Sequence, residues 1–166
     1  MNVPEDKQAF VARFGAVFEH SPWVAERAWE KRPFASVDLL HQAMIQAAAQ
    51  ATMEEKLALV RAHPELAGRE AKAGALTAGS AGEQGRLGFT SLGTEEFLKM
   101  QEINRAYREK FGFPCIIALR LHRSRDSVMQ EMQQRLRNSP EIELNNALQQ
   151  IGHIARGRLE KLFGEG

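Results

Sequence analysis

The sequence lacks the features that mark several common classes of protein. Its 166 residues include one cysteine, so no disulfide can form within the chain, and no apolar run approaches the length that spans a membrane. The formal net charge is +1, and Lys and Arg are interleaved with Asp and Glu instead of forming a basic block. The first residues include Glu5 and Asp6, unlike the basic start of a signal peptide. We therefore expect a reducing, cytoplasmic setting, with no membrane partner and no nucleic-acid partner.

The sequence patterns of metal and cofactor chemistry are also missing. There is no glycine-rich nucleotide-binding sequence, no pair of cysteines and no HExxH, and the five histidines are scattered without the spacing of a zinc site. Cys115 lies in an apolar run, which favours a small buried hydrophobe over an activated thiol. We therefore predict no bound metal and no cofactor.

What the sequence does contain is helix signals from end to end, whereas alternating apolar and polar runs of strand type are nearly absent. The length suits one domain with its own core. We predict an all-α fold of about eight helices in a single domain that spans residues 1–166, with a glycine-rich irregular segment near the middle.

Several helix boundaries can be placed from local signals. One helical face near the N-terminus is marked by Phe10, Phe14, Val17 and Phe18. Further helix starts are predicted at Ser21 followed by Pro22, at Ser36, at Thr52 in a capping box with Glu55, and at Thr94, Ser124 and Ser139. The helix after Thr94 should end at Gly112, and the apolar run 113–119 that follows is predicted to be an extended loop entering a helix.

His63 is the first candidate for chemistry because of its place in the chain. Pro64 disfavours helical backbone at the preceding residue, so a helix should stop just before His63 and leave the imidazole at a junction. Imidazole exchanges protons near neutral pH, which suits a general acid or base. The alternative is a histidine that caps the carbonyls of the helix end, and spacing alone does not separate the two interpretations.

The segment Ser80-Ala81-Gly82-Glu83-Gln84 also has two interpretations. Ser80 and Glu83 have the spacing of a helix capping box. Alternatively, these residues lie in a glycine-rich region where backbone N–H groups could face a ligand, and the Gln84 amide can both donate and accept hydrogen bonds. A polar ligand with imide or urea groups would suit that arrangement.

Arg158 is the most informative charged residue. It follows Ile154 by four residues and precedes Leu162 by four, so it falls on the apolar stripe of the last helix. A guanidinium on that face either meets an anion or lies at the edge of the stripe with its head in water. Both alternatives remain open at this level.

Four parts of the chain together resemble one known family. They are His63-Pro64-Glu65-Leu66-Ala67-Gly68, the Ser80-x-x-Glu83-Gln84 segment, Asn104 with Tyr107 ahead of Lys110-Phe111-Gly112-Phe113-Pro114, and Arg158-Leu159. Over nearly the whole chain the sequence resembles the 2-oxo-4-hydroxy-4-carboxy-5-ureidoimidazoline (OHCU) decarboxylase family. The resemblance implies an all-helical enzyme of urate breakdown, commonly a homodimer, that converts this ureidoimidazoline to (S)-allantoin. It also implies that no cofactor is needed, because a carbon–nitrogen double bond in the substrate can accept the electron pair left by carbon dioxide.

The resemblance also implies roles for individual residues. His63 would be the general acid or base that engages the substrate hydroxyl, with Glu83 as its proton-handling partner. The implied substrate-binding residues are Pro64, Ser80, Gln84, Ile116, Ile117 and Arg158. Among these, Pro64 would fix the backbone of His63, and Ser80 and Gln84 would bind ring or ureido groups. Backbone N–H groups around Ile116 and Ile117 would hold a carbonyl, and Arg158 would meet polar or anionic groups.

Two other classes of protein remain compatible with the residues themselves. A non-catalytic helical module would use His63 and Glu83 as helix caps and catalyse nothing. A ureide-binding protein would bind allantoin but leave the ureidoimidazoline to decay at its background rate. Accelerated loss of that compound separates the enzyme from both.

Overall fold

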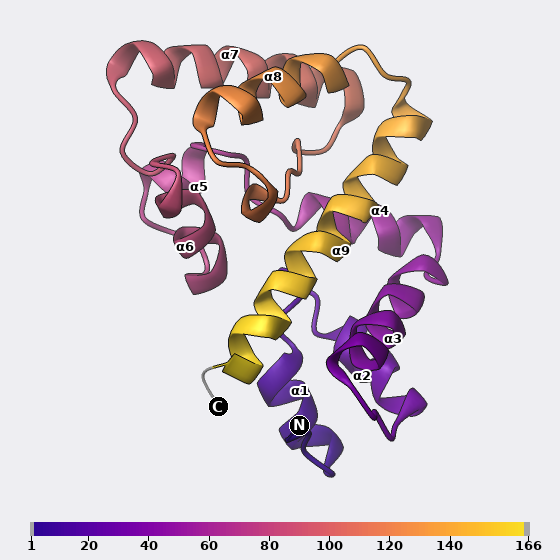
Figure 1. Ribbon diagram of the computed structural model, residues 1–166. Coiled ribbons are helices and arrows are strands. Elements are labelled where there is room, and N and C mark those ends of the chain that lie inside the picture. The colour runs from indigo at the N-terminus through magenta and orange to yellow at the C-terminus, as the bar shows by residue number, and fades with distance from the viewer. Residues whose placement is uncertain (1, 165–166) are drawn as a thin grey trace. The chain divides into compact units, whose positions relative to one another are not determined.

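The computed structural model describes residues 2–164, and its helices are labelled in Figure 1. Within these residues there is no strand, so the predicted all-α class is confirmed. The α-helices are α1 (Lys7–Phe14), α2 (Trp23–Ala28), α3 (Val37–Ala49), α4 (Met53–Arg61), α5 (Arg69–Lys72), α6 (Ala78–Arg86), α7 (Thr94–Phe111), α8 (Arg125–Arg135) and α9 (Pro140–Gly164). Two short 3-10 helices are η1 (Trp29–Lys31) and η2 (Leu119–Leu121). Among the helices of the described part, none combines the length and apolar character that a membrane span requires.

The contacts within the chain divide it into two compact units. The first contains residues 2–62 and 152–164 of the described part, and the second contains residues 63–151. Helix α9 contributes its first half to the second unit and its second half to the first. The expectation of a single domain over residues 1–166 stays a prediction.

The first unit has an aromatic core. Phe10 is fully buried, and its ring lies 4.9 Å from that of Phe14 and 5.3 Å from that of Trp29, centroid to centroid. Helices α2 and α3 pack against each other, and α3 adds the fully buried Leu40 and Met44. Such close packing of large apolar side chains is the main favourable term in folding.

Most of the predicted caps are confirmed. The Ser36 hydroxyl accepts a hydrogen bond from the Leu39 N–H at 3.2 Å and starts α3. Thr52 and Glu55 form both hydrogen bonds of a capping box, at 3.1 and 3.0 Å, at the start of α4. Ser124 and Ser139 cap α8 and α9 in the same way. These caps satisfy backbone N–H groups that a helix leaves without partners in its first turn.

The first predicted helix is too long. Helix α1 ends at Phe14, and Val17 and Phe18 lie in the turns that follow, although both are buried. Gly15 has a low helix propensity and stands at the break. All four apolar residues are buried, as their helical spacing suggested, but Val17 and Phe18 reach the core from turns and not from the helix.

Two predicted helix starts are also wrong in detail. The Ser21 hydroxyl donates to the Glu19 carbonyl instead of capping, and α2 begins at Trp23 without a side-chain cap. Helix α7 has Gly93 as its N-cap, one residue before the predicted Thr94. In both cases the backbone reaches its helical conformation without the side-chain hydrogen bond that the residue type suggested.

The second unit is built around α7. This helix ends at Gly112, whose φ of 76° is the left-handed conformation that favours glycine, as predicted. Residues 114–118 belong to no helix or strand and lead into η2, and Ala118 has extended backbone, which confirms the predicted loop entering a helix. The stretch between α4 and α7 holds the short helices α5 and α6, joined by turns.

We predict that Glu55 makes the first unit sensitive to acid. Hydrogen bonds from the Arg27 guanidinium, and next from the Thr52 backbone N–H, lower the pKa of the Glu55 carboxyl from its ordinary 4.5 to about 2. The stabilisation is therefore complete above pH 4.5 and is lost as the pH falls towards 2. Glu55→Gln keeps the capping box but not the charge, so its free energy of unfolding should fall less steeply over that range than that of the wild type.

Urea unfolding at successive pH values measures both slopes. Glu54→Gln is the matched control, because it removes an exposed carboxylate from the same helical turn. Parallel curves for wild type and Glu55→Gln would contradict the prediction.

Candidate active site

His63 lies just beyond the end of α4. The helix ends at Arg61, Ala62 is its C-cap, and His63 occupies the bend before Pro64, as the proline predicts. The His63 side chain is buried, with 7% of its surface exposed. Residues 63–68, called here the His63 loop, therefore present a buried imidazole on irregular backbone.

Helix α6 is hydrogen-bonded directly to the His63 loop through Gln84. The Gln84 Oε1 accepts from the Ala67 N–H at 2.9 Å, and its Nε2 donates to the Glu65 carbonyl at 3.3 Å. Gln84 is itself buried, with 3% exposed. The structure thus brings the helix that carries Glu83 against the loop that carries His63.

Ser80 is an interior residue of α6, so the capping-box interpretation of Ser80 and Glu83 is wrong. The N-cap is Thr77, whose hydroxyl accepts from the Ser80 N–H at 3.3 Å. Residues three and four apart share one face of a helix, so Ser80, Glu83 and Gln84 lie along the same side of α6. Ser80 and Gln84 are buried, and Glu83 is half-buried.

Helix α7 holds the same loop from a second direction. Asn104 Nδ2 donates to the Leu66 carbonyl at 2.9 Å, and Gln101 Nε2 donates to the Ala67 carbonyl at 3.0 Å. Ala67 has a φ of 51°, in the left-handed region that a residue with a Cβ rarely adopts. Side-chain hydrogen bonds from two helices therefore hold the loop in a backbone conformation that it would otherwise disfavour.

The segment with Ile116 and Ile117 is also buried and fixed, with each residue 3% exposed. The Ile116 carbonyl accepts from Arg135 Nη1 at 2.5 Å, and the Ala118 N–H donates to Gln150 Oε1 at 2.8 Å. Within residues 2–164, the Ile116 and Ile117 N–H groups make no hydrogen bond. Buried N–H groups of this kind are rare and are suited to a bound polar group.

Helix α6 is connected to this segment as well as to the His63 loop. Arg86, in the last turn of α6, donates to the Leu119 carbonyl and, at 2.9 Å, to the His122 carbonyl. All but one of the eight predicted site residues belong to the second unit. They are His63, Pro64, Ser80, Glu83, Gln84, Ile116 and Ile117.

Arg158 belongs to the first unit and meets an anion of its own chain. Its Nη2 lies 2.9 Å from a carboxylate oxygen of Glu19, and Nη1 approaches the carbonyls of Ala16 and Val17 at 3.5 and 3.4 Å. The Glu19 side chain is 1% exposed and that of Arg158 is 11% exposed. The sequence allowed either an anion partner for Arg158 or a place at the edge of the apolar stripe, and the structure has the anion partner. The sequence did not predict that this partner is Glu19.

The chemistry of Cys115 agrees with its predicted place in the core. Burial raises the pKa of its thiol to about 12, so it is neutral at physiological pH. Within residues 2–164 there is also no group of three His, Cys, Asp or Glu side chains arranged to hold a metal ion.

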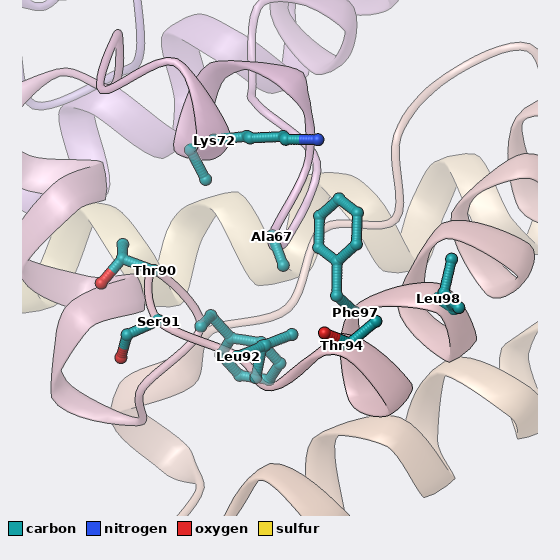
Figure 2. Close-up of a pocket in the computed structure, with 10 residues that line it drawn as sticks. Ala67, Lys72, Thr90, Ser91, Leu92, Thr94, Phe97 and Leu98 are labelled. Carbon is teal, nitrogen blue, oxygen red and sulfur yellow. The ribbon is translucent and has the colours of Figure 1, made fainter.

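A pocket of about 520 Å³ is lined by Ala67, by residues of α5 and α7, and by residues 89–92. Figure 2 shows the Lys72 side chain extending towards the Phe97 ring, and its Nζ is 5.0 Å from the ring centroid. The side chains of Thr90 and Ser91 lie on the side of the pocket opposite Phe97. No predicted site residue lines this pocket.

Comparisons with known proteins identify the family of the chain. The OHCU decarboxylase family model matches residues 5–160. An OHCU decarboxylase of Haloferax volcanii is 40% identical over 95% of this chain and 91% of its own length, and one of Mus musculus is 40% identical over 93% and 86%. The crystal structure of an (S)-allantoin synthase superposes with a TM-score of 0.75 at 26% identity, covering 95% of this chain and 51% of that one.

The fold and these matches define the class as an all-helical decarboxylase. More specifically, the chain belongs to the 2-oxo-4-hydroxy-4-carboxy-5-ureidoimidazoline decarboxylase family.

We predict that Gln84 is required for the stability of the second unit as well as for its site. Gln84→Leu would leave the buried Ala67 N–H without its partner and the Glu65 carbonyl with the Gly68 N–H alone, at a cost of about 2 kcal/mol in the free energy of unfolding. Gln101→Leu is the matched control, because it removes one hydrogen bond from a half-exposed position where water can replace the amide. Urea denaturation gives both values, and equal costs would contradict this account.

Proposed function

We propose that this protein catalyses the decarboxylation of OHCU to (S)-allantoin in the breakdown of urate. Its family membership supports the reaction class. The observation that carries the assignment to a site is the pair of hydrogen bonds from Gln84, which join the helix of Glu83 to the loop of His63.

The reaction itself places few demands on the protein. The bond between the ring carbon and the carboxylate breaks, carbon dioxide leaves, and its electron pair moves into the adjacent carbon–nitrogen double bond. The nitrogen takes up a proton, a second proton is delivered to one face of the carbon that had carried the double bond to nitrogen, and the hydroxyl loses its proton to become the carbonyl of allantoin. Binding, orientation and proton transfer are therefore the protein's work, and no cofactor is needed as an electron sink.

His63 and Glu83 are assigned the proton-transfer roles. His63 engages the substrate hydroxyl as general acid or base, and Glu83 is its proton-handling partner. Pro64 and the hydrogen bonds on residues 65–67 support this by fixing the loop on which the imidazole is mounted. A rigid mounting matters because catalytic efficiency falls quickly when a reacting group is misplaced.

The remaining second-unit residues are assigned to substrate binding. The Ile116 and Ile117 N–H groups are donors for a substrate carbonyl, which is supported by the burial of both residues and by the absence of a hydrogen bond from either N–H within residues 2–164. Ser80 lies on the same face of α6 as Glu83 and binds ring or ureido groups together with Gln84. Part of the capacity of Gln84 is already used in holding the His63 loop.

We further propose that the enzyme works in the cytoplasm as a homodimer built from single-domain chains, as the family resemblance implies. Its partner molecule is the small ureidoimidazoline substrate, and no role with nucleic acid or membrane is proposed.

We predict that His63→Ala and Glu83→Ala each lower kcat by about a hundredfold or more, because general acid–base groups contribute at that scale. The substrate is generated from urate in situ, and its loss is followed by absorbance. His153→Ala and Glu102→Ala, which remove exposed side chains of the same types, should retain wild-type kcat.

Circular dichroism provides the check that the variants are folded. A folded His63→Ala protein with near-wild-type kcat would remove His63 from the mechanism. If the wild type itself bound allantoin without accelerating the reaction, the protein would be a ureide-binding protein instead.

The substrate-binding role of Arg158 stays a prediction, and its test has to separate that role from the ion pair with Glu19. Arg158→Met should destabilise the fold by about 3 kcal/mol, because it removes the ion-pair partner of a carboxylate that is 1% exposed. The double variant Arg158→Met with Glu19→Gln should recover most of that loss. If Arg158 binds substrate, KM stays raised in the double variant. A wild-type KM in the double variant would limit Arg158 to its role beside Glu19.

A further inference from the structure

A buried carboxylate in the second unit is surrounded by donors. Glu143, in the first turn of α9, is fully buried and accepts hydrogen bonds from the Tyr107 hydroxyl, from Asn138 Nδ2 at 3.0 Å and from Asn146 Nδ2 at 2.9 Å. Arg135 Nε donates to both of its oxygens, at 3.1 and 3.0 Å. The network joins α7, α8 and α9.

The protonation states of this network are fixed at neutral pH. Burial acts to raise the pKa of Glu143, but the hydrogen bonds from Arg135, Asn146 and Tyr107 outweigh it and hold that pKa below its ordinary value. Burial raises the pKa of Tyr107, so its hydroxyl stays a donor. Arg135 therefore faces a carboxylate that remains ionised.

The Arg135 guanidinium connects this carboxylate to the backbone. Its side chain is 8% exposed, its Nη2 pairs with Glu143 at 3.0 Å, and its Nη1 donates to the Ile116 carbonyl at 2.5 Å. A buried ion pair of this kind is seldom a source of net stability, because apolar residues of similar volume often serve as well. Its geometric effect is more informative than its energy.

The planarity of the peptide bond determines that geometric effect. In a trans peptide, the carbonyl of one residue and the N–H of the next lie in one plane and point in opposite directions. Because Arg135 holds the Ile116 carbonyl, it also fixes the direction of the Ile117 N–H, which points away from the guanidinium. Gln150 fixes the next peptide by accepting from the Ala118 N–H.

We propose that Arg135, held in place by Glu143 and Tyr107, is a positioning residue that aims the Ile117 N–H at the substrate carbonyl. This inference rests on the proposed function, because it assumes that the Ile116–Ile117 backbone binds substrate. It gives a role to Tyr107, which the family resemblance included without assigning one. It also explains why a charged network lies in the core of this unit.

Kinetic comparison of Arg135→Lys with wild type tests the proposal. Lysine keeps the charge, but its single ammonium cannot reproduce the planar fork that reaches both Glu143 and the Ile116 carbonyl. We expect KM for the ureidoimidazoline, and the inhibition constant of (S)-allantoin, to rise about tenfold, as for the loss of one well-placed hydrogen bond. The kcat should change less than about threefold, because the proposed proton-transfer groups lie on other elements.

Arg125→Lys is the matched control. Arg125 is on the same helix and likewise pairs with a carboxylate, Glu96, and donates to a backbone carbonyl, that of Leu87. The Arg125→Lys variant should have a lower free energy of unfolding and an unchanged KM. Equal KM values for Arg135→Lys and wild type, with or without a lower melting temperature, would overturn the proposal.

A second variant and a direct probe complete the test. Tyr107→Phe removes one donor to Glu143 without changing Arg135 itself, so Arg135 is held less firmly and KM should rise severalfold. If Arg135→Lys fails to fold, an unchanged KM in Tyr107→Phe would overturn the proposal. In ¹⁵N spectra, (S)-allantoin should shift the Ile117 amide resonance of wild type, and shift it less in Tyr107→Phe. Failure of the proposed function is separate, because it would appear as a wild-type protein that does not accelerate decarboxylation.

Discussion

The candidate site depends on one side-chain amide, that of Gln84. Its two hydrogen bonds satisfy a backbone donor and a backbone acceptor of the His63 loop, which belongs to no helix or strand. They also join the loop to the face of α6 that carries Ser80 and Glu83. Without them the N–H of Ala67, a buried residue with left-handed backbone, would be unpaired in the core, which is costly.

The same solution is used for the second irregular segment of this unit. Residues 115–118 are buried but belong to no helix or strand, so their carbonyl and N–H groups need partners from side chains. Arg135 and Gln150 supply two of these partners. In both segments, helices that are rigid by themselves position irregular backbone, and irregular backbone is where polar groups can be turned towards a ligand.

The sequence predicted those parts of the structure that local signals decide. Caps such as Ser36 and Thr52 are specified within four residues, and Pro64 alone placed the end of α4 before His63. The capping-box interpretation of Ser80 was wrong because Thr77, three residues earlier, provides a better-placed hydroxyl. The buried partners of Arg135 and Arg158 could not be predicted from spacing. An acidic residue in the first turn of a helix, such as Glu143, is normally exposed, and its donor Tyr107 lies 36 residues away along the chain.

The central claim is that this helical protein converts OHCU stereoselectively with its own side chains and backbone. The most direct test generates the unstable substrate from urate in the presence of a chelator, adds the wild-type protein, and records the chirality of the allantoin formed. The account predicts faster decay of the substrate and a single enantiomer, (S)-allantoin. Racemic allantoin formed at the background rate would contradict it.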